Sequence, residues 1–322
     1  MIDIQKAIEQ LNWNREPKGL YEPIEYTLSS GGKRLRPTLA LIAAEAVING
    51  GLINGDRIED VLPAALALEV FHNFTLLHDD VMDKADVRRG RPTVHVKWDD
   101  NTAILSGDQM LIEAYKLLSN VPADKLPQVL KWFNEMATGI CEGQQYDVDF
   151  EHANYVSIDD YMMMIEKKTS VLLAYAMQIG GYIAGGTPEQ LTALYQFGLH
   201  IGLAFQIQDD ILDVYGDSKT FGKAIGGDIC CNKKTFLLLS ALENADPESK
   251  AELLQWLLVS DRKEEKIAAI TAIYNRLNVR EAGETVIEQH TATALAQLDK
   301  LPQNAATERL RVLAEKLVVR NQ

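Results

Sequence analysis

The chain has 322 residues, of which 47% are hydrophobic, and its formal net charge is -14 at pH 7. Such an acidic protein is a poor partner for nucleic acid or an anionic membrane surface, although small anionic substrates are not excluded. Strong helix formers dominate, whereas alternating β-branched segments bounded by turn residues are nearly absent. The composition therefore predicts an all-α protein that does not bind nucleic acid.

The cysteines and the apolar segments indicate a cytoplasmic protein. Cys141, Cys230 and Cys231 lack the spacing of a zinc site and are typical of reduced intracellular thiols. The first residues lack the basic and apolar regions of a secretory signal. The longest apolar candidate for a membrane span, 171–186, contains four glycines and is too short. We therefore expect no transmembrane segment.

Helical periodicity begins early and continues with short interruptions at 31–32, 49–51, 185–188 and 246–247. Each interruption is too short to be a linker, so we expect one domain over residues 1–322. The expected fold is a large helical bundle of about a dozen helices around a central cavity.

Two apolar segments predict long central helices. Pro63 suits the first turn of a helix that runs to about Asp83. Thr187 and Pro188 suit the N-cap and the first position of a second helix that runs to about Asp213. Both segments are apolar on several faces, so we expect other helices to surround them.

One acidic pattern, Asp-Asp-x-x-Asp, occurs at the end of both predicted helices. The carboxylates are Asp79, Asp80 and Asp83 in the first copy and Asp209, Asp210 and Asp213 in the second. Residues four apart lie on nearly the same helical face, so each helix presents a cluster of negative charge. Negative charge near a helix C-terminus opposes the helix dipole, which predicts a compensating gain elsewhere.

Metal binding is the simplest gain from two such clusters. Ligand sets made only of oxygen favour magnesium or calcium over zinc. The alternative is that each motif is simply an acidic helix end exposed to water. This explanation suits a single motif better than two copies of the same motif. We expect both acidic ends to meet across one cavity.

Basic residues accompany these motifs. Residues 31–36 place three cations behind a glycine pair, which permits close approach of the backbone to a ligand. Further cations follow the first acidic motif at 88–91. Lysine supplies a point charge, and arginine supplies a bidentate fork suited to phosphate. Because protein-bound magnesium is often completed by substrate phosphates, the pattern favours a diphosphate substrate over simple balancing of surface charge.

Together these residues resemble the trans-isoprenyl diphosphate synthases, also called polyprenyl synthetases. The resemblance rests on segments in family order, which are 31–37, 72–83, 88–93, 143–147, 168–169, 205–213, 222–223 and 227–233. It implies an all-α prenyltransferase that condenses isopentenyl diphosphate head to tail with an allylic diphosphate. The implied products are diphosphate and a prenyl diphosphate of about fifteen to twenty carbons.

The resemblance also implies a metal site and an allylic diphosphate site. Three magnesium ions are implied, with Asp79 and Asp83 as ligands of two and Asp209 as a ligand of the third. The residues in supporting positions would be Asp80, Asp210, Asp213, Asp228, Gln144 and Asp147. The allylic diphosphate would be held by Arg88, Lys168, Lys223 and Lys233. The catalytic residues would be Lys168, which binds the departing diphosphate, and Thr169 and Gln206, whose polar groups would help to stabilise the carbocation.

A second, metal-free site for isopentenyl diphosphate is implied by the same resemblance. Its residues would be Lys33, Arg36, His72, Arg89 and Phe205. His72 lies seven residues before Asp79, two helical turns away, so it can face the same cavity.

Three residues would set the length of the product. The growing tail should run along the first acidic helix past Phe71, Phe74 and Thr75. The family resemblance implies that a bulky aromatic residue five positions before the first Asp, here Phe74, is the floor of the cavity in a short-chain enzyme. We interpret His78 and His95 as structural.

Two other functions share some of these features. A class I terpene cyclase would not need Lys33, Arg36 and Arg89, and its second metal motif normally mixes Asn, Ser or Thr with Glu. A non-catalytic partner subunit of a prenyl synthase would be expected to lack some acidic positions, whereas both motifs are intact here. The family resemblance also implies a homodimer.

Overall fold

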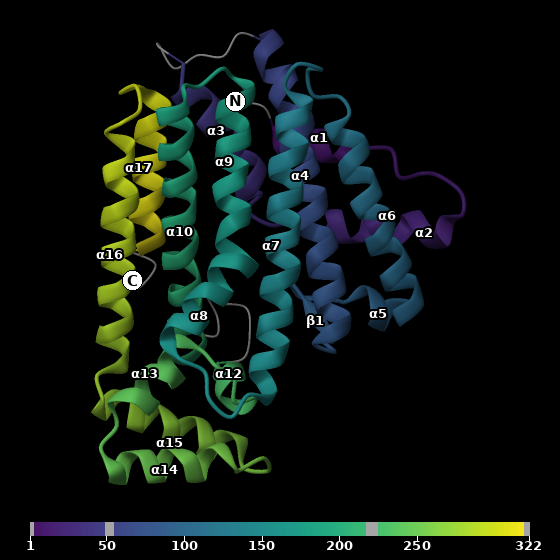
Figure 1. The fold of residues 1–322 in the computed structure, drawn as a ribbon. Coiled ribbons are helices and arrows are strands. Elements are labelled where there is room, and N and C mark those ends of the chain that lie inside the picture. Colours follow the sequence, from purple (N-terminus) through teal and green to yellow (C-terminus); the bar gives the residue numbers. More distant parts are fainter. Residues whose placement is uncertain (1–2, 49–54, 217–224, 319–322) are drawn as a thin grey trace. The chain divides into compact units, whose positions relative to one another are not determined.

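The computed structural model describes residues 3–48, 55–216 and 225–318. In these ranges the chain is almost entirely helical, with one short antiparallel hairpin (Figure 1), so the expected all-α class is confirmed. The elements are α1 (Ile4–Glu9), α2 (Lys18–Leu28), α3 (Leu35–Ala46), α4 (Gly55–Met82), β1 (Val87–Arg88), β2 (Arg91–Pro92), α5 (Val94–Lys97), α6 (Asp100–Leu118), α7 (Leu126–His152), α8 (Ile158–Ile165), a π-helical turn η1 (Glu166–Ser170), α9 (Val171–Ile183), α10 (Pro188–Tyr215), α12 (Gly227–Cys230), α13 (Phe236–Asn244), α14 (Pro247–Leu257), α15 (Lys263–Arg276), α16 (Val279–Leu298) and α17 (Ala305–Val318).

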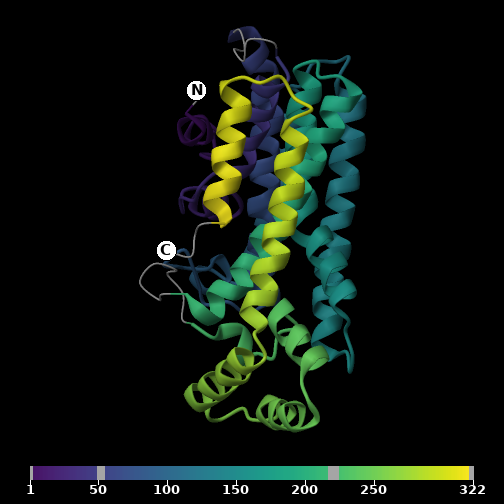
Figure 2. The same cartoon turned by 90° about the vertical axis from the view of Figure 1, so that its left-hand side faces the viewer.

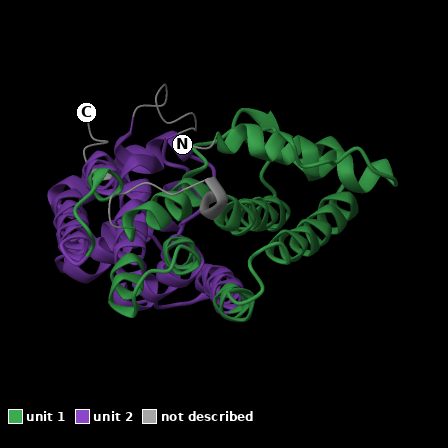
Figure 3. Ribbon diagram, turned by 90° about the horizontal axis from the view of Figure 1, so that it is seen from above, with its two compact units in different colours: residues 1–134, 175–194, 301–308 green, residues 135–174, 195–300, 309–322 purple. Residues whose placement is uncertain are grey.

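The chain divides into two compact units, which Figure 3 colours separately. Unit 1 comprises residues 1–134, 175–194 and 301–308, and unit 2 comprises residues 135–174, 195–300 and 309–322. Some helices, such as α7 and α10, contribute residues to both units. The first acidic motif lies in unit 1, and the second lies in unit 2.

In unit 1, α4 is a core helix that packs along α6 and α3 (Figure 1). Its residues Val61, Ala64 and Leu68 are fully buried. Helix α9 lies close to α3 at Gly180, where an added Cβ atom would lie 2.0 Å from the carbonyl oxygen of Ala40. Only glycine permits this approach, and the approach holds α9 against the core of the unit.

The start of α4 differs from the sequence-based expectation. The helix begins at Gly55, so Pro63 lies in its interior and not in its first turn. An interior proline forfeits one backbone hydrogen bond and crowds the preceding turn. The surrounding segment is tightly packed, because Val61, Ala64 and Ala65 are all fully buried, and this burial offsets the local loss.

The start of α10 agrees with expectation. Thr187 Oγ1 accepts a hydrogen bond from the Gln190 amide at 3.3 Å, and Gln190 Oε1 accepts one from the Thr187 amide at 2.8 Å. This reciprocal capping arrangement fixes the first turn at Pro188. The helix then runs through the second acidic motif to Tyr215.

Among the described residues, one helix segment, Glu59–Met82 in α4, is long and apolar enough to cross a membrane, with a mean hydropathy of 1.3. The choice of 171–186 as the longest apolar candidate was therefore wrong, since α9 ends at Ile183. Within α4, 67% of the most apolar window is buried in the protein. Such burial is typical of the core helix of a globular protein.

Unit 2 has its own apolar core. It joins α8, α10, α13, α15 and α16 through buried residues such as Ile207, Leu237 and Ile273. Helices α13, α14 and α15 pack against one another and are the light green helices at the lower end of Figure 2. This core positions the end of α10, because Ile207 and Ile211 are buried on the helix that carries the second acidic motif.

Candidate active site

The first acidic motif occupies the last turn of α4. The Asp83 amide donates to the Asp79 carbonyl at 2.8 Å, so Asp83 continues the helical geometry one residue beyond Met82. Asp79 is partly exposed and Asp83 is exposed, whereas Asp80 between them is buried. The motif thus separates one inward carboxylate from two outward ones.

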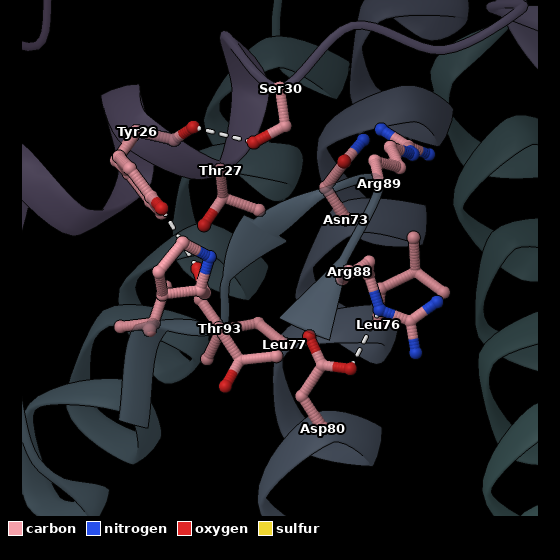
Figure 4. A pocket seen from close by; sticks show the side chains of 12 residues that line it. Tyr26, Thr27, Ser30, Asn73, Leu76, Leu77, Asp80, Arg88, Arg89 and Thr93 are labelled. Atoms are coloured by element: carbon pink, nitrogen blue, oxygen red, sulfur yellow. Dashed lines mark hydrogen bonds and ion pairs between the residues drawn. The ribbon is translucent and has the colours of Figure 1, made fainter. Parts of the chain in front are cut away.

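The buried carboxylate of Asp80 is paired with Arg88. Arg88 Nε donates to Asp80 Oδ1 at 2.6 Å, as the dashed line in Figure 4 shows. Burial raises the pKa of Asp80, and the neighbouring Arg88 guanidinium partly offsets that rise. Asp80 therefore fixes the position of Arg88.

Arg88 and Arg89 lie on the β1–β2 hairpin. Asp80, Arg88 and Arg89 line one pocket of unit 1, together with residues of α2 and α4 (Figure 4). Arg89 Nη1 donates to the Gly31 carbonyl at 2.5 Å, and its guanidinium lies 3.0 Å from where a Cβ atom on Gly32 would stand. Gly32 therefore leaves room for the Arg89 guanidinium, and Gly31 supplies the carbonyl that accepts its hydrogen bond.

The three cations after the glycine pair have different environments. Lys33 is exposed, whereas Arg34 is buried and donates to Glu69 Oε1 at 2.7 Å and to the Leu28 carbonyl. The charge of Arg34 is therefore neutralised inside the protein, which agrees with its absence from the predicted isopentenyl diphosphate site. Arg36 remains as the second candidate. Its buried Nε donates to no described residue, and burial, reinforced by nearby Arg89, lowers its pKa to about 10.

His72 lies among these arginines. Burial lowers the pKa of His72 well below its usual value, and the positive charges of Arg36, Arg89, Arg88 and Arg34 lower it further. The imidazole is therefore neutral at neutral pH. Arg36, Arg88 and Arg89 surround this neutral donor or acceptor with positive charge, which is an environment suited to a polyanion.

The three residues expected to set product length lie one to two turns before Asp79. Phe71 is fully buried, and its ring centroid lies 5.4 Å from that of Phe74 and 5.2 Å from that of Phe133. Phe74 is only partly buried and contacts the His78 ring at 4.8 Å. Thr75 donates from its hydroxyl to the His72 carbonyl at 2.8 Å, so it faces its own helix.

The two histidines interpreted as structural make local contacts. His78 Nε2 lies 3.0 Å from the Ile104 carbonyl oxygen, and a Cβ atom on Gly107 would collide with the His78 ring at 2.2 Å. His95 Nδ1 lies 3.1 Å from Thr93 Oγ1.

The second acidic motif repeats this arrangement in unit 2. Asp210, the middle residue, is buried, and Asp209 and Asp213 are partly exposed. Tyr161 donates from its hydroxyl to Asp210 Oδ2 at 2.5 Å, and the Phe236 amide donates to the same oxygen at 3.1 Å. Burial and the charge of Asp228 raise the pKa of Asp210 to about 7, while these hydrogen bonds limit the rise.

Asp213 joins the end of α10 to α12. Its carboxylate accepts from the Asp228 amide at 3.0 Å, and its carbonyl oxygen accepts from the Gly226 amide at 2.6 Å. Asp228 is thereby held near Asp210, whose pKa it raises. Lys233 is exposed beyond α12, and Lys223 lies outside the described residues.

Lys168 and Thr169 lie on the π-helical turn η1 between α8 and α9. Lys168 Nζ donates to Asp147 Oδ2 on α7 at 2.5 Å, and Thr169 Oγ1 donates to Gln206 Oε1 on α10 at 3.1 Å. Gln206 Nε2 lies 3.4 Å from Asp210 Oδ1, which links the turn to the acidic motif. The extra residue in a π turn is frequent at functional sites.

Two glycines allow η1 to approach its neighbours. A Cβ atom on Gly143 of α7 would lie 2.3 Å from the Lys168 amide nitrogen, and one on Gly202 of α10 would lie 2.6 Å from Ser170 Cα. Next to Gly143, Gln144 has a buried Oε1 that accepts no hydrogen bond from any described residue. This acceptor therefore needs a water or ligand donor.

Phe205 is partly buried on α10, one residue before Gln206.

In the described ranges, no three acidic, histidine or cysteine side chains form a group that could hold a metal ion by themselves.

A family model, described as polyprenyl synthetase, matches residues 17–276. This chain belongs to the polyprenyl synthetase family. The match includes every residue that we selected as a site candidate, from Lys33 to Lys233, and takes in parts of both units.

Members of this family resemble the chain over most of its length. A geranylgeranyl diphosphate synthase of Methanosarcina mazei is 43% identical over 74% of this chain and 72% of its own length. A geranylfarnesyl diphosphate synthase of Natronomonas pharaonis is 37% identical over 99% of this chain and 95% of its own. A crystal structure of geranylgeranyl pyrophosphate synthetase from Pyrococcus horikoshii has a TM-score of 0.90 at 32% identity, covering 98% and 95% of the two chains.

Sequence reasoning missed some contributors to this polyprenyl synthetase site. The hydroxyl of Tyr161 and the backbone amide of Phe236 hold Asp210, although neither belongs to the acidic motif. No local spacing indicated Tyr161, because it contacts Asp210 across a separation of 49 residues. No sequence pattern marked the Phe236 amide.

The neutral state of His72 predicts a pH effect on stability. Its pKa is lower in the folded chain than in the unfolded chain, so unfolding takes up a proton below pH 6.5 and stability falls with falling pH. Between pH 7.5 and 5.5 without substrate, the free energy of unfolding in urea should fall about 1 kcal/mol more for the wild type than for His72→Gln. His152→Gln, which changes an exposed histidine, is the control. Equal pH dependence in all three proteins would contradict the assignment.

Proposed function

We propose that this polyprenyl synthetase is a magnesium-dependent trans-prenyltransferase that joins isopentenyl diphosphate to an allylic diphosphate. The observation that carries the proposal is the repeated acidic motif, in which a buried middle carboxylate is held by the protein and the outer carboxylates are more exposed. Relatives named as geranylgeranyl and geranylfarnesyl diphosphate synthases support this class of reaction.

The donor chemistry of the two motifs fits magnesium. Asp79, Asp83 and Asp209 offer only carboxylate oxygens, and the unsatisfied Gln144 oxygen offers an acceptor for a metal-bound water. Magnesium typically takes one or two carboxylates and completes its shell with waters and substrate phosphates, so a ready-made group of three protein ligands is not required. Three ions per site are expected, and when bound they neutralise charge on the departing diphosphate.

The cations fall into two groups according to the substrate that each would bind. In unit 1, Arg88 would grip the allylic diphosphate, while Lys33, Arg36 and Arg89 would bind isopentenyl diphosphate with neutral His72 as a hydrogen-bonding partner. In unit 2, Lys168 would bind the allylic diphosphate, and Lys223 and Lys233 are further candidates for that site.

The carbocation left by ionisation needs an electron-rich, dry neighbourhood. Oxygen atoms of Thr169 and Gln206, which contact each other, would stabilise it, and the Phe205 ring would pack near the isopentenyl chain. Exclusion of water matters because water would capture the cation.

We further propose that both units form one catalytic domain over residues 1–322 and that the enzyme is soluble and cytoplasmic. The match of one family model to parts of both units supports a single domain.

Product analysis tests the function directly. The purified chain should elongate an allylic diphosphate with labelled isopentenyl diphosphate and magnesium, and EDTA should abolish the reaction. Asp79→Ala and Asp209→Ala should each lower turnover at least about a hundredfold while the helical circular dichroism is retained. Asp124→Asn, at a well-exposed position outside the motifs, is the matched control.

The same assay separates the rival functions. A terpene cyclase would release hydrocarbon from the allylic diphosphate alone, and a non-catalytic subunit would be inactive by itself. Absence of elongation with every primer would contradict the proposed function. Near-normal activity of either Asp variant would contradict the metal assignment.

We also propose a product of fifteen to twenty carbons, with twenty favoured, limited by the Phe74 ring. Phe74 is partly buried and is held by Phe71 and His78, so its removal should extend the cavity and not collapse it. Phe74→Ala should therefore shift the chromatographic product distribution to longer chains, whereas Tyr155→Ala, at an exposed position, should not. Wild-type products beyond twenty-five carbons would contradict this role for Phe74.

A homodimer is the proposed assembly. Helix α6 packs along α4 and also leaves four large apolar side chains exposed, which are Ile104, Leu105, Ile112 and Tyr115. Exposed apolar side chains gathered on one element are typical of an interaction surface. Sedimentation should give twice the chain mass of 35.9 kDa, and Ile112→Glu should give the monomer. Leu254→Glu on α14 introduces the same charge at another exposed aliphatic residue and should leave the dimer intact. A monomeric wild type would refute the assembly.

A further inference from the structure

Tyr26, near the end of α2, contacts the hairpin that carries Arg88 and Arg89. Its hydroxyl donates to the Pro92 carbonyl on β2 at 2.8 Å. Figure 4 marks this bond by the dashed line that starts at the Tyr26 hydroxyl. Its ring lies 3.9 Å from the guanidinium carbon of Arg91 and 3.9 Å from Lys97 Nζ. The edge contact with Trp98, at 5.3 Å between centroids, completes the packing around the ring.

The residues after Tyr26 hold the same hairpin. Arg91 Nη1 donates to Ser29 Oγ at 3.2 Å and lies 3.4 Å from Ser30 Oγ. Both serine hydroxyls in turn donate to the Tyr26 carbonyl at 2.9 Å. One residue further on, the Gly31 carbonyl accepts the hydrogen bond from Arg89. The segment 26–31 therefore contacts both β2 and the turn of the hairpin.

The position of β2 determines the position of Arg89, because both belong to one tight hairpin. Val87 pairs with Pro92 and Arg88 with Arg91, which leaves Arg89 and Gly90 as a two-residue turn. Both have positive φ, 52° and 74°, as a tight hairpin turn of this kind requires. The turn contains only two residues, so the contacts that hold Pro92 and Arg91 also fix the backbone position of Arg89.

We propose that Tyr26 is a positioning residue for Arg89 in the isopentenyl diphosphate site. This inference rests on the proposed function, because Arg89 is assigned to that substrate there. The tyrosine hydroxyl fixes β2, while its ring holds the Arg91 and Lys97 cations beside the pocket that Tyr26, Arg88 and Arg89 line.

Arg88 is less dependent on Tyr26 than Arg89 is. Asp80 of α4 holds Arg88 through a 2.6 Å ion pair, so Arg88 has an anchor outside segment 26–31. Arg89 is instead bound to Gly31, within that segment. Loss of the Tyr26 hydroxyl should therefore weaken binding of isopentenyl diphosphate more than binding of the allylic diphosphate.

Steady-state kinetics of Tyr26→Phe test this difference. The variant keeps the ring and loses only the hydrogen bond to Pro92, so the KM for isopentenyl diphosphate should rise about three- to tenfold. The allylic KM and kcat should stay within about twofold of wild type. Arg91→Met, which removes the guanidinium from the ring and from the serine hydroxyls, should change the same KM in the same direction.

Tyr21→Phe is the matched control. Tyr21 lies on the same helix, where its ring contacts Arg15 at 4.2 Å, and the substitution should leave all three constants unchanged. If the wild type elongates but Tyr26→Phe has an unchanged isopentenyl KM, or loses only kcat, the positioning role is wrong and the proposed function stands. If the wild type elongates no primer, the proposed function itself fails.

Discussion

The structure depends on reducing the repulsion among the carboxylates of the two acidic motifs. Each acidic motif has three carboxylates within five residues, and in each the middle one is withdrawn from water. Asp80 is paired with Arg88, and Asp210 is held by the Tyr161 hydroxyl and the Phe236 amide. A buried carboxylate without such partners would be costly, so these contacts also fix the end of each helix in place.

The cationic side of the site follows the same logic. Arg34 is neutralised internally by Glu69. Burial lowers the pKa of both Arg36 and Arg89, and neighbouring positive charge lowers each further, from Arg89 in the case of Arg36 and from Arg34 and Arg88 in the case of Arg89. Keeping His72 neutral avoids adding another charge to this group. The result is a positive region whose charge is left to be balanced by a ligand, next to a helix end whose carboxylates suit a cation.

The sequence predicted the class of fold and the motifs well, because helical periodicity, proline and threonine caps and acidic spacing act locally. Thus the start of α10 at Pro188 was predictable. The start of α4 was not, because packing of Val61 and its neighbours overrides the preference of Pro63 for a first turn. The partners of Arg34 and Asp210 were also hidden. Arg34 and its partner Glu69 are separated by 35 positions in the sequence. Asp210 is separated by 49 positions from Tyr161 and by 26 from Phe236, and no local pattern encodes contacts at such separations.

The π-helical turn η1 has a consequence for how this region tolerates change in length. Such a turn contains one residue more than a regular helix of the same rise, and here that residue lies within 166–170. Deletion of one residue would restore the regular helix, but it would rotate the side chains on one side of the deletion by about 100° relative to those on the other. Lys168 and Thr169 would then no longer face Asp147 and Gln206 together. The segment therefore admits substitutions far more readily than insertions or deletions.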